Sequence, residues 1–275
     1  MGDFYMAAAH RHPHWTRWVA LALAFLVVGT YMALTPPGLL SKADWVSAAV
    51  CHRIPSHSFS FAGRPLPLCA RCTGTFLGAL TALFGQAVFL RRRGASFPPP
   101  AITAALVGFI LLMGIDGVNS YVDLMRGTPL FYEPRNELRL VTGALNGLAL
   151  GAILWPMVHL SLWRSPLPEP VIRNGKDLGI LLLMEAGVAA LVLSGRPVLL
   201  YPLALASALG VLALLTLTMT VLVVIVAGRE NRYERWRDAL TPLLVGLTMA
   251  VLLVGLVDLV RYGATGTITG VPGLE

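Results

Sequence analysis

Residues 199 to 227 read LLYPLALASALGVLALLTLTMTVLVVIVA, a stretch of 29 residues without one charged side chain. The hydrocarbon core of a bilayer is about 30 Å thick, and a helix needs about 20 apolar residues to cross it. A backbone inside lipid must satisfy its own hydrogen bonds, so the stretch is predicted to be a helix. Its length suits one long tilted helix better than two spans.

Six further apolar runs have the length of a membrane span, and they are separated by polar or proline-containing connections. They are residues 18–34, 73–90, 101–118, 140–162, 178–194 and 239–260. The sequence therefore predicts an all-α, polytopic integral membrane helix bundle of about seven transmembrane helices. A shorter segment begins at Ser41 with a possible capping box that ends at Asp44, and it predicts a short interfacial helix through Val50.

The composition supports the same class of protein. Hydrophobic residues make up 56% of the chain and charged residues 13%, against about 45–50% and about 25% in soluble domains. The net charge of +7 would suggest nucleic acid in a soluble protein. Here the basic residues lie in short connections between apolar runs, which is typical of membrane topology and of contact with anionic lipid. We therefore expect membrane lipid, and no nucleic acid, as a partner.

Three regions are predicted: a basic N-terminal tail (1–17), a membrane domain with the first four spans (18–163), and three further spans with a short C-terminal tail (164–275). With the N-terminus in the cytoplasm, twelve Lys and Arg residues lie on the cytoplasmic side and nine on the other. The positive-inside rule thus favours N-in, C-out. The histidines at 10, 12 and 14 are interpreted as part of a solvated tail rather than a metal site.

All three cysteines fall between the first two spans. Cys51 follows the predicted interfacial helix, and Cys69-Ala-Arg-Cys72 opens the second span. The N-terminus of a helix carries partial positive charge, and Arg71 adds a full one, so both favour thiolate over thiol. Thiolate is the form that binds metal or attacks a disulfide, which makes this segment the first candidate site.

Cys51, His52, Cys69 and Cys72 could together form a tetrahedral Cys3His zinc site. The two-residue gap between Cys69 and Cys72 is the usual chelating spacing. Cys51 and His52 are adjacent, and adjacent side chains point in different directions on a regular backbone. One of the two could therefore bind alone, or His57 could substitute. Zinc is the only cofactor that the sequence suggests.

The same residues permit other functions. Cys69 and Cys72 could form a reversible disulfide with Cys51 as the exchanging thiol, as in a membrane thiol–disulfide oxidoreductase. The cysteines could also be a structural clip or three inert thiols. A further class is a non-enzymatic transporter or membrane assembly component, which predicts a polar path across the bundle with Glu185 of the fifth span lining it.

A second polar region lies between the third and fourth spans. Asp116 ends an apolar run, where a carboxylate is costly unless it is paired, and a pair with Arg139 is predicted. Arg135 and Arg139 are four residues apart, so on a helix they would share a face and could hold a phosphate or carboxylate. The alternative is a pair of ordinary helix-end anchors facing headgroups.

The predicted topology brings these regions together. The connections after the first and third spans emerge on the same side, where the seventh span ends with Asp258. We expect Asp116 as a candidate base and Arg139 as a second catalytic residue, with Arg135 and Asn136 binding an anionic or lipid-linked small substrate. Separately, Gly143, Gly147 and Gly151 have the four-residue spacing of a closely packed membrane helix.

These motifs resemble a family of bacterial and archaeal membrane proteins called domain of unknown function 2085. Its signature is Cys-His-x-x-Pro-x-Arg-Ser-Phe, then Cys-x-Arg-Cys-Thr-Gly, Asp-Gly and Asn-x-Leu-Arg-x-x-Thr-Gly. The matching residues here are Cys51, His52, Pro55, Ser58 and Phe59, then Cys69, Arg71, Cys72, Thr73 and Gly74, then Asp116 and Gly117, and finally Asn136, Leu138, Arg139, Thr142 and Gly143. His57 departs from the pattern, which has arginine there, and this argues against His57 as a required ligand. The resemblance covers roughly residues 45–150 and implies a shared site in the cytoplasmic membrane of a prokaryote, without an activity.

Overall fold

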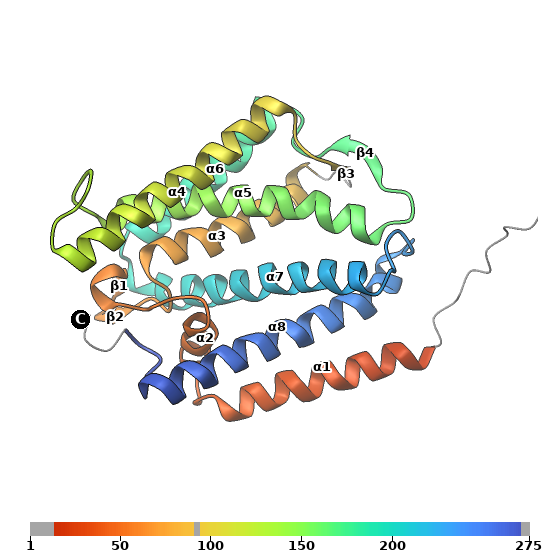
Figure 1. The fold of residues 1–275 in the computed structure, drawn as a ribbon, viewed down its shortest axis with the longest axis horizontal. Coiled ribbons are helices and arrows are strands. Elements are labelled where there is room, and N and C mark those ends of the chain that lie inside the picture. The colour runs from red at the N-terminus through yellow and green to blue at the C-terminus, as the bar shows by residue number, and fades with distance from the viewer. Residues whose placement is uncertain (1–13, 91–93, 271–275) are drawn as a thin grey trace, which may run out of the picture.

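The computed structural model describes residues 14–90 and 94–270, and it is a bundle of long helices that run back and forth between two ends (Figure 1). Each predicted run forms a helix, so the all-α bundle is confirmed. The long helices are α1 (His14–Leu34), α3 (Ala70–Gly85, continued by a π-helical turn at Gln86–Leu90), α4 (Pro100–Arg126), α5 (Asn136–Leu162), α6 (Gly175–Leu193), α7 (Leu200–Val226) and α8 (Trp236–Thr265). Most of the predicted basic tail lies outside the described residues.

Six of these helices are long and apolar enough to cross a membrane. The exception is α6, whose 19 residues include Lys176, Asp177 and Glu185. It still connects the end of the bundle where α5 stops to the opposite end where α7 begins (Figure 1). The longest apolar run forms one helix, α7, of 27 residues, which at 1.5 Å per residue is about 40 Å long and can cross the bilayer with a tilt.

The short elements lie at the two ends of the bundle. A ten-residue helix, α2, and a small antiparallel sheet lie at the end where α3 begins, and a parallel strand pair lies at the other end (Figure 1). Their bounds are α2 (Leu39–Ala48), η1 (Pro55–His57), β1 (Ser60–Phe61), β2 (Arg64–Pro65), β3 (Gly94–Ser96), β4 (Leu167–Pro170) and η3 (Pro197–Leu199).

The predicted capping box at the start of α2 is wrong. The helix begins earlier than expected, with Gly38 at the N-cap position and no side-chain cap hydrogen bond. Gly38 has φ 97°, a left-handed conformation that favours glycine. Asp44, the acidic residue of the expected box, binds Arg53 at 2.6 Å and Arg64 at 2.8 Å instead. The helix itself is confirmed, and it packs against α7 and α8.

The helices α3 and α5 pack closely against each other, and glycine makes this contact possible. A Cβ atom built on Gly143 would lie 2.1 Å from the carbonyl oxygen of Arg71, and one on Gly147 would lie 2.1 Å from that of Thr75. No side chain fits in such a space, so the predicted close packing of this helix is confirmed. The contact also sets the first turns of α3 and α5 side by side, which brings the two predicted polar regions together.

The predicted convergence of connections is confirmed as well. The connection after α1, the connection after α4 and the end of α8 all lie at the end of the bundle that carries the β1–β2 sheet (Figure 1). Outside this end, large apolar side chains such as Phe25 and Val226 are more than four-fifths exposed. Such a surface is solvated by lipid in a membrane protein.

Candidate functional site

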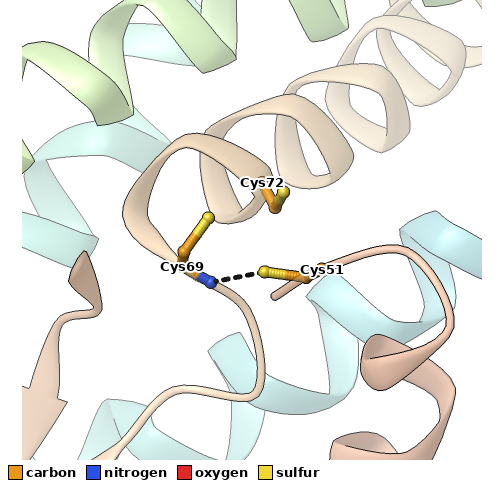
Figure 2. A group of neighbouring side chains, drawn as sticks. All are labelled: Cys51, Cys69 and Cys72. Carbon is orange, nitrogen blue, oxygen red and sulfur yellow. Dashed lines mark hydrogen bonds between the residues drawn. The ribbon is translucent and has the colours of Figure 1, made fainter. Parts of the chain in front are cut away.

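The three cysteine side chains converge on one point (Figure 2). Cys51 comes from the loop after α2, Cys69 is the N-cap residue of α3, and Cys72 lies in the first turn of the same helix. Their sulfur atoms all lie within 4.8 Å of one another. All three are free thiols, with Cys51 and Cys69 buried and Cys72 half-buried. We call these residues the sulfur cluster.

Backbone N–H groups support Cys51. The Sγ atom accepts a hydrogen bond from the N–H of Cys69 at 3.2 Å, drawn in Figure 2, and from the N–H of Arg53 at 3.4 Å. Arg53 reaches this position with φ 55°, an unusual value for a residue with a side chain. Such a conformation costs free energy and is typical of functional sites.

The thiols also differ in acidity. Hydrogen bonds from the thiols of Cys69 and Cys72 lower the pKa of Cys51, and its two N–H donors add to this effect. Donating to Cys51 raises the pKa of Cys69. Cys51 is therefore the more acidic of these two thiols. A metal that binds all three sulfurs would have to displace the protons of the cluster.

The spacing of the sulfur atoms fits a tetrahedral thiolate site. With Zn–S bonds of about 2.3 Å, sulfurs in such a site are about 3.8 Å apart, and the sulfurs of the cluster all lie within 4.8 Å of one another. Within the described part of the chain, no histidine, aspartate or glutamate joins the group as a fourth member. The protein therefore offers three ligands and leaves the fourth position to another group.

His52 lies beside the cluster without joining it. Its Nδ1 accepts a hydrogen bond from the N–H of Ile54 at 3.1 Å, so only Nε2 remains for a metal. The rings of His52 and His57 meet edge to face, with centroids 5.6 Å apart. Burial lowers the pKa of His52, and burial together with Arg139 lowers that of His57 to about 4. The imidazole of His57 is therefore neutral at pH 7.

Two arginines that the sequence analysis did not single out hold the Cys51 loop. Arg261, near the end of α8, donates to the carbonyl oxygens of Cys51 at 2.6 Å and His52 at 3.0 Å, and also to those of Ala48 and Gly270. Arg53 donates to the carbonyl oxygen of Pro67 at 2.9 Å, besides its ion pair. Neither arginine belongs to a recognisable motif, so only the folded chain shows these contacts.

Asp116 is completely buried, and its partner is not the predicted one. Its Oδ2 accepts from Arg71 Nη2 at 2.5 Å and from Arg71 Nε at 2.8 Å, and its Oδ1 accepts from the hydroxyl of Tyr132 at 2.7 Å. The predicted Asp116–Arg139 pair is therefore wrong. The reason is that α4 continues to Arg126, so Asp116 lies inside a helix that faces the first turn of α3 rather than at a helix end.

Arg139 is also buried, but it has polar neutral partners. Its Nη1 donates to Asn136 Oδ1 at 2.9 Å, and its Nε approaches Ser120 Oγ at 3.5 Å. Ser120 Oγ also accepts from Arg71 Nη2 at 2.8 Å. Asn136 in turn donates to the carbonyl oxygen of Ser56 at 3.1 Å, next to His57. Ser120 thus joins the arginines of α3 and α5.

Arg135 lies apart from this network. It is the N-cap residue of α5, with φ −123° and ψ 147°, and its side chain is exposed. The expectation that Arg135 and Arg139 share a helical face is therefore wrong, because the helix begins only at Asn136. Arg71, which the sequence analysis connected only with the thiols, takes the place beside Arg139.

Two other acidic residues remain outside the site. Asp258 accepts a hydrogen bond from the hydroxyl of Tyr31 at 2.9 Å, and it joins α8 to α1. Glu185 of α6 is buried, and neither of its oxygens has a hydrogen-bond partner among the described residues. The transporter class stays a prediction.

The fold and the sulfur cluster define a class: a multi-pass helical membrane protein with a buried cysteine site at one end of its bundle. Residues 51–153 match the family described as predicted membrane protein (DUF2085). The match begins at Cys51 and ends within α5, so it includes the sulfur cluster, Arg71, Asp116 and Arg139 but not Arg261.

Relatives in two archaea agree with this match. An uncharacterized protein of Methanothermobacter thermautotrophicus is 37% identical over 114 residues, which is 41% of this chain and 91% of the relative. One of Methanocaldococcus jannaschii is 26% identical over 120 residues, 44% of this chain and 70% of the relative. No solved structure matches. The chain belongs to this family of predicted membrane proteins, as its cysteine motifs indicated.

Proposed function

We propose that this protein binds zinc through Cys51, Cys69 and Cys72 at one face of the membrane and acts there on an anionic or lipid-linked small molecule. One observation carries the proposal: the free sulfur atom of the Cys51 loop and the two at the start of α3 lie within 4.8 Å of one another, with Cys51 and Cys69 buried. Thiolates so close together repel each other unless a cation or protons lie between them. Zinc is the metal that such a cysteine set suits best.

Three protein ligands with one open position are typical of zinc sites that bind a water or a substrate. His52 is the proposed fourth ligand when no substrate is bound, through Nε2, which is the ring nitrogen left by its bond to Ile54. A bound zinc would polarise a substrate oxygen or lower the pKa of a bound water. The described residues supply the ligands and the surrounding hydrogen bonds.

The other candidate residues receive different roles in this proposal. Both carboxylate oxygens of Asp116 are already bonded, so we assign it to orienting Arg71 rather than to proton abstraction. Arg139 has no such carboxylate and faces the substrate, with Asn136 fixing its guanidinium group. Arg135 is exposed at the same end, where it attracts anionic headgroups.

We also propose that the chain lies in the cytoplasmic membrane of a prokaryote with its N-terminus inside. The relatives come from archaea, and the twelve-to-nine distribution of Lys and Arg supports this orientation. The sulfur cluster would then face the outside of the cell.

An outward-facing cluster gives some support to the thiol–disulfide oxidoreductase as a second candidate, because thiols outside the cytoplasm meet oxidants. The proximity of Cys51 to both Cys69 and Cys72 would permit the exchange of one disulfide between them. The two candidates differ in what the purified protein contains, which is bound metal or a disulfide.

The test is zinc content and free-thiol count on the same detergent-purified protein. We expect about one zinc per chain, and three thiols that react only after chelation. Cys51→Ser and Cys69→Ser should lose the metal. Ser47→Ala should keep it, because it removes a buried hydroxyl that has no hydrogen-bond partner among the described residues. Protein without zinc and with a Cys69–Cys72 disulfide would overturn the proposal in favour of the oxidoreductase.

A further inference from the structure

Two guanidinium groups and one carboxylate meet beside the sulfur cluster. Arg71 of α3 and Arg139 of α5 both approach the hydroxyl of Ser120, and Asp116 pairs with Arg71 alone. The group formed by Arg71, Arg139, Ser120 and Asp116 therefore carries one excess positive charge. Asp123 acts on Arg139 only at longer range, because no ion pair joins them.

Arg139 is the unusual member of this group. Its side chain is 6% exposed, and no carboxylate of the described residues lies within ion-pair distance of it. A buried charge without a counter-ion is costly. A guanidinium group has five N–H donors, and the bonds to Asn136 and Ser120 use only two of them. The bond from Arg139 Nη1 to the half-buried Asn136 is itself only partly buried, so this edge of the guanidinium group lies near solvent.

We propose that Arg71 and Arg139, with Ser120 and Asn136 holding them in place, bind a phosphate group. Arginine presents planar paired donors that match the oxygens of a phosphate, and two of them can bind different oxygens of the same group. The site lies next to the sulfur cluster, since Arg71 precedes Cys72 on the first turn of α3.

The loop between α4 and α5 identifies the source of the phosphate as a lipid. Asn119, fully buried, accepts from the N–H groups of Leu130 and Phe131 and donates to the carbonyl oxygen of Tyr132, whose hydroxyl binds Asp116. The same loop exposes Leu130 by 48% and Phe131 by 71%. A loop that is fixed on the polar side of the site and presents apolar side chains outward fits the boundary between headgroups and acyl chains.

The ligand is therefore a phosphate carried by a membrane lipid, with its headgroup on the arginines and its acyl chains beside Phe131. This inference deepens the proposed function by naming the class of substrate, and it rests on that function only for the idea that ligand and metal share one site. The arginine contacts themselves include no cysteine, so binding of the lipid can be measured whether or not zinc is present.

The experiment measures binding of three probes to the full chain in detergent: a short-chain phosphatidic acid, the matching phosphatidylcholine and inorganic phosphate. We expect tightest binding of phosphatidic acid, whose phosphate is unshielded. Arg139→Gln should weaken it by about tenfold or more, because a charged hydrogen-bond donor is lost. Arg196→Gln is the control, an exposed arginine at the same end of the bundle, and should change binding by less than about twofold.

A second variant of Arg139 and the comparison of the lipid with inorganic phosphate distinguish the possible outcomes. Arg139→Lys retains the charge but not the paired donors, so it should bind more weakly than wild type while folding normally. Equal binding by wild type and both Arg139 variants would overturn the proposal, as would an equal loss in Arg196→Gln. Inorganic phosphate that binds as tightly as phosphatidic acid would overturn the lipid assignment.

Zinc content is measured on the same samples. Wild-type protein without zinc that still binds phosphatidic acid through Arg139 would remove the proposed function and leave this inference standing. Protein that contains zinc but binds no phosphatidic acid would overturn this inference and leave the proposed function standing.

Discussion

Replacing Gly143 by alanine is expected to disturb both the helix pair and the sulfur cluster. The added Cβ would lie 2.1 Å from the carbonyl oxygen of Arg71 and 3.1 Å from the backbone nitrogen of Thr75, whereas ordinary contacts begin at 3.4 Å. The atoms in the way are backbone atoms of a helix, which cannot turn aside as a side chain can. The helices α3 and α5 must therefore separate by about 1.3 Å at this point.

Overpacking of this kind typically costs about 1–3 kcal/mol, and backbone contact places Gly143→Ala near about 3 kcal/mol. For a chain of this size such a loss corresponds to a fall of roughly 6–10 °C in the midpoint of thermal unfolding. The displaced turn of α3 also carries Cys72. Since a zinc–sulfur bond is only about 2.3 Å long, a shift of about 1.3 Å would remove that ligand.

Tryptophan fluorescence of the detergent-purified protein can follow thermal unfolding, and zinc per chain is measured in parallel. Gly108→Ala on α4 is the control, because nothing lies within 4 Å of its added Cβ, and alanine has the higher helix propensity. If Gly143→Ala unfolded at the wild-type temperature and kept its zinc, the close contact of α3 and α5 would not exist as described.

Three further changes test other parts of the structure. Arg261→Gln removes the hydrogen-bond donors to the carbonyl oxygens of Cys51 and His52. The zinc affinity, measured in competition with a chelator, should therefore fall about tenfold. Arg196→Gln, at the same end of the bundle, should leave the zinc affinity unchanged. Burial, and after it Arg139, lowers the pKa of His57 in the folded protein to about 4, whereas the pKa in the unfolded chain is about 6.5. The stability that neutral His57 contributes to the metal-free protein should therefore be complete above about pH 6.5 and be lost as the pH falls toward 4. The thermal midpoint of His57→Gln should fall less steeply over this range than that of wild type, and parallel curves would contradict this. Glu185→Leu should raise the thermal midpoint, because it replaces a buried carboxyl group without a partner among the described residues; a large fall would show that the carboxyl has a role the structure does not explain.

The helices were predictable because lipid imposes a long apolar run on every span. This explains why the run ending near residue 227 was correctly assigned to one helix. Helix ends outside the lipid depend on specific contacts instead. The sequence placed the end of the third span near residue 118, but α4 continues to Arg126, since Asn119 and Tyr132 bind the following loop back against it.

The sequence predicted where in the fold the site lies, but only some of the contacts between its residues. The clustering of the cysteines followed from their positions beside one connection and from topology. The partner of Asp116 did not, because the choice between Arg71 and Arg139 depends on how α3, α4 and α5 are rotated about their axes. The orientation of His52 likewise depends on one backbone turn, at Arg53 and Ile54, that no sequence pattern specifies.

The contact of Arg261 with the Cys51 loop has a mechanical consequence. Helix α8 has 30 residues, and its apolar part, residues 239–260, is about 33 Å long, so a small tilt fits it to a hydrocarbon layer of about 30 Å. A thinner bilayer makes it lean further, and the bonds from Arg261 carry that movement to the carbonyl oxygen of Cys51. We expect zinc affinity to differ between vesicles of short and long acyl chains, and equal affinities would show that the loop yields instead. Through the guanidinium group of Arg261, the zinc affinity of the cysteines would therefore depend on the thickness of the surrounding membrane.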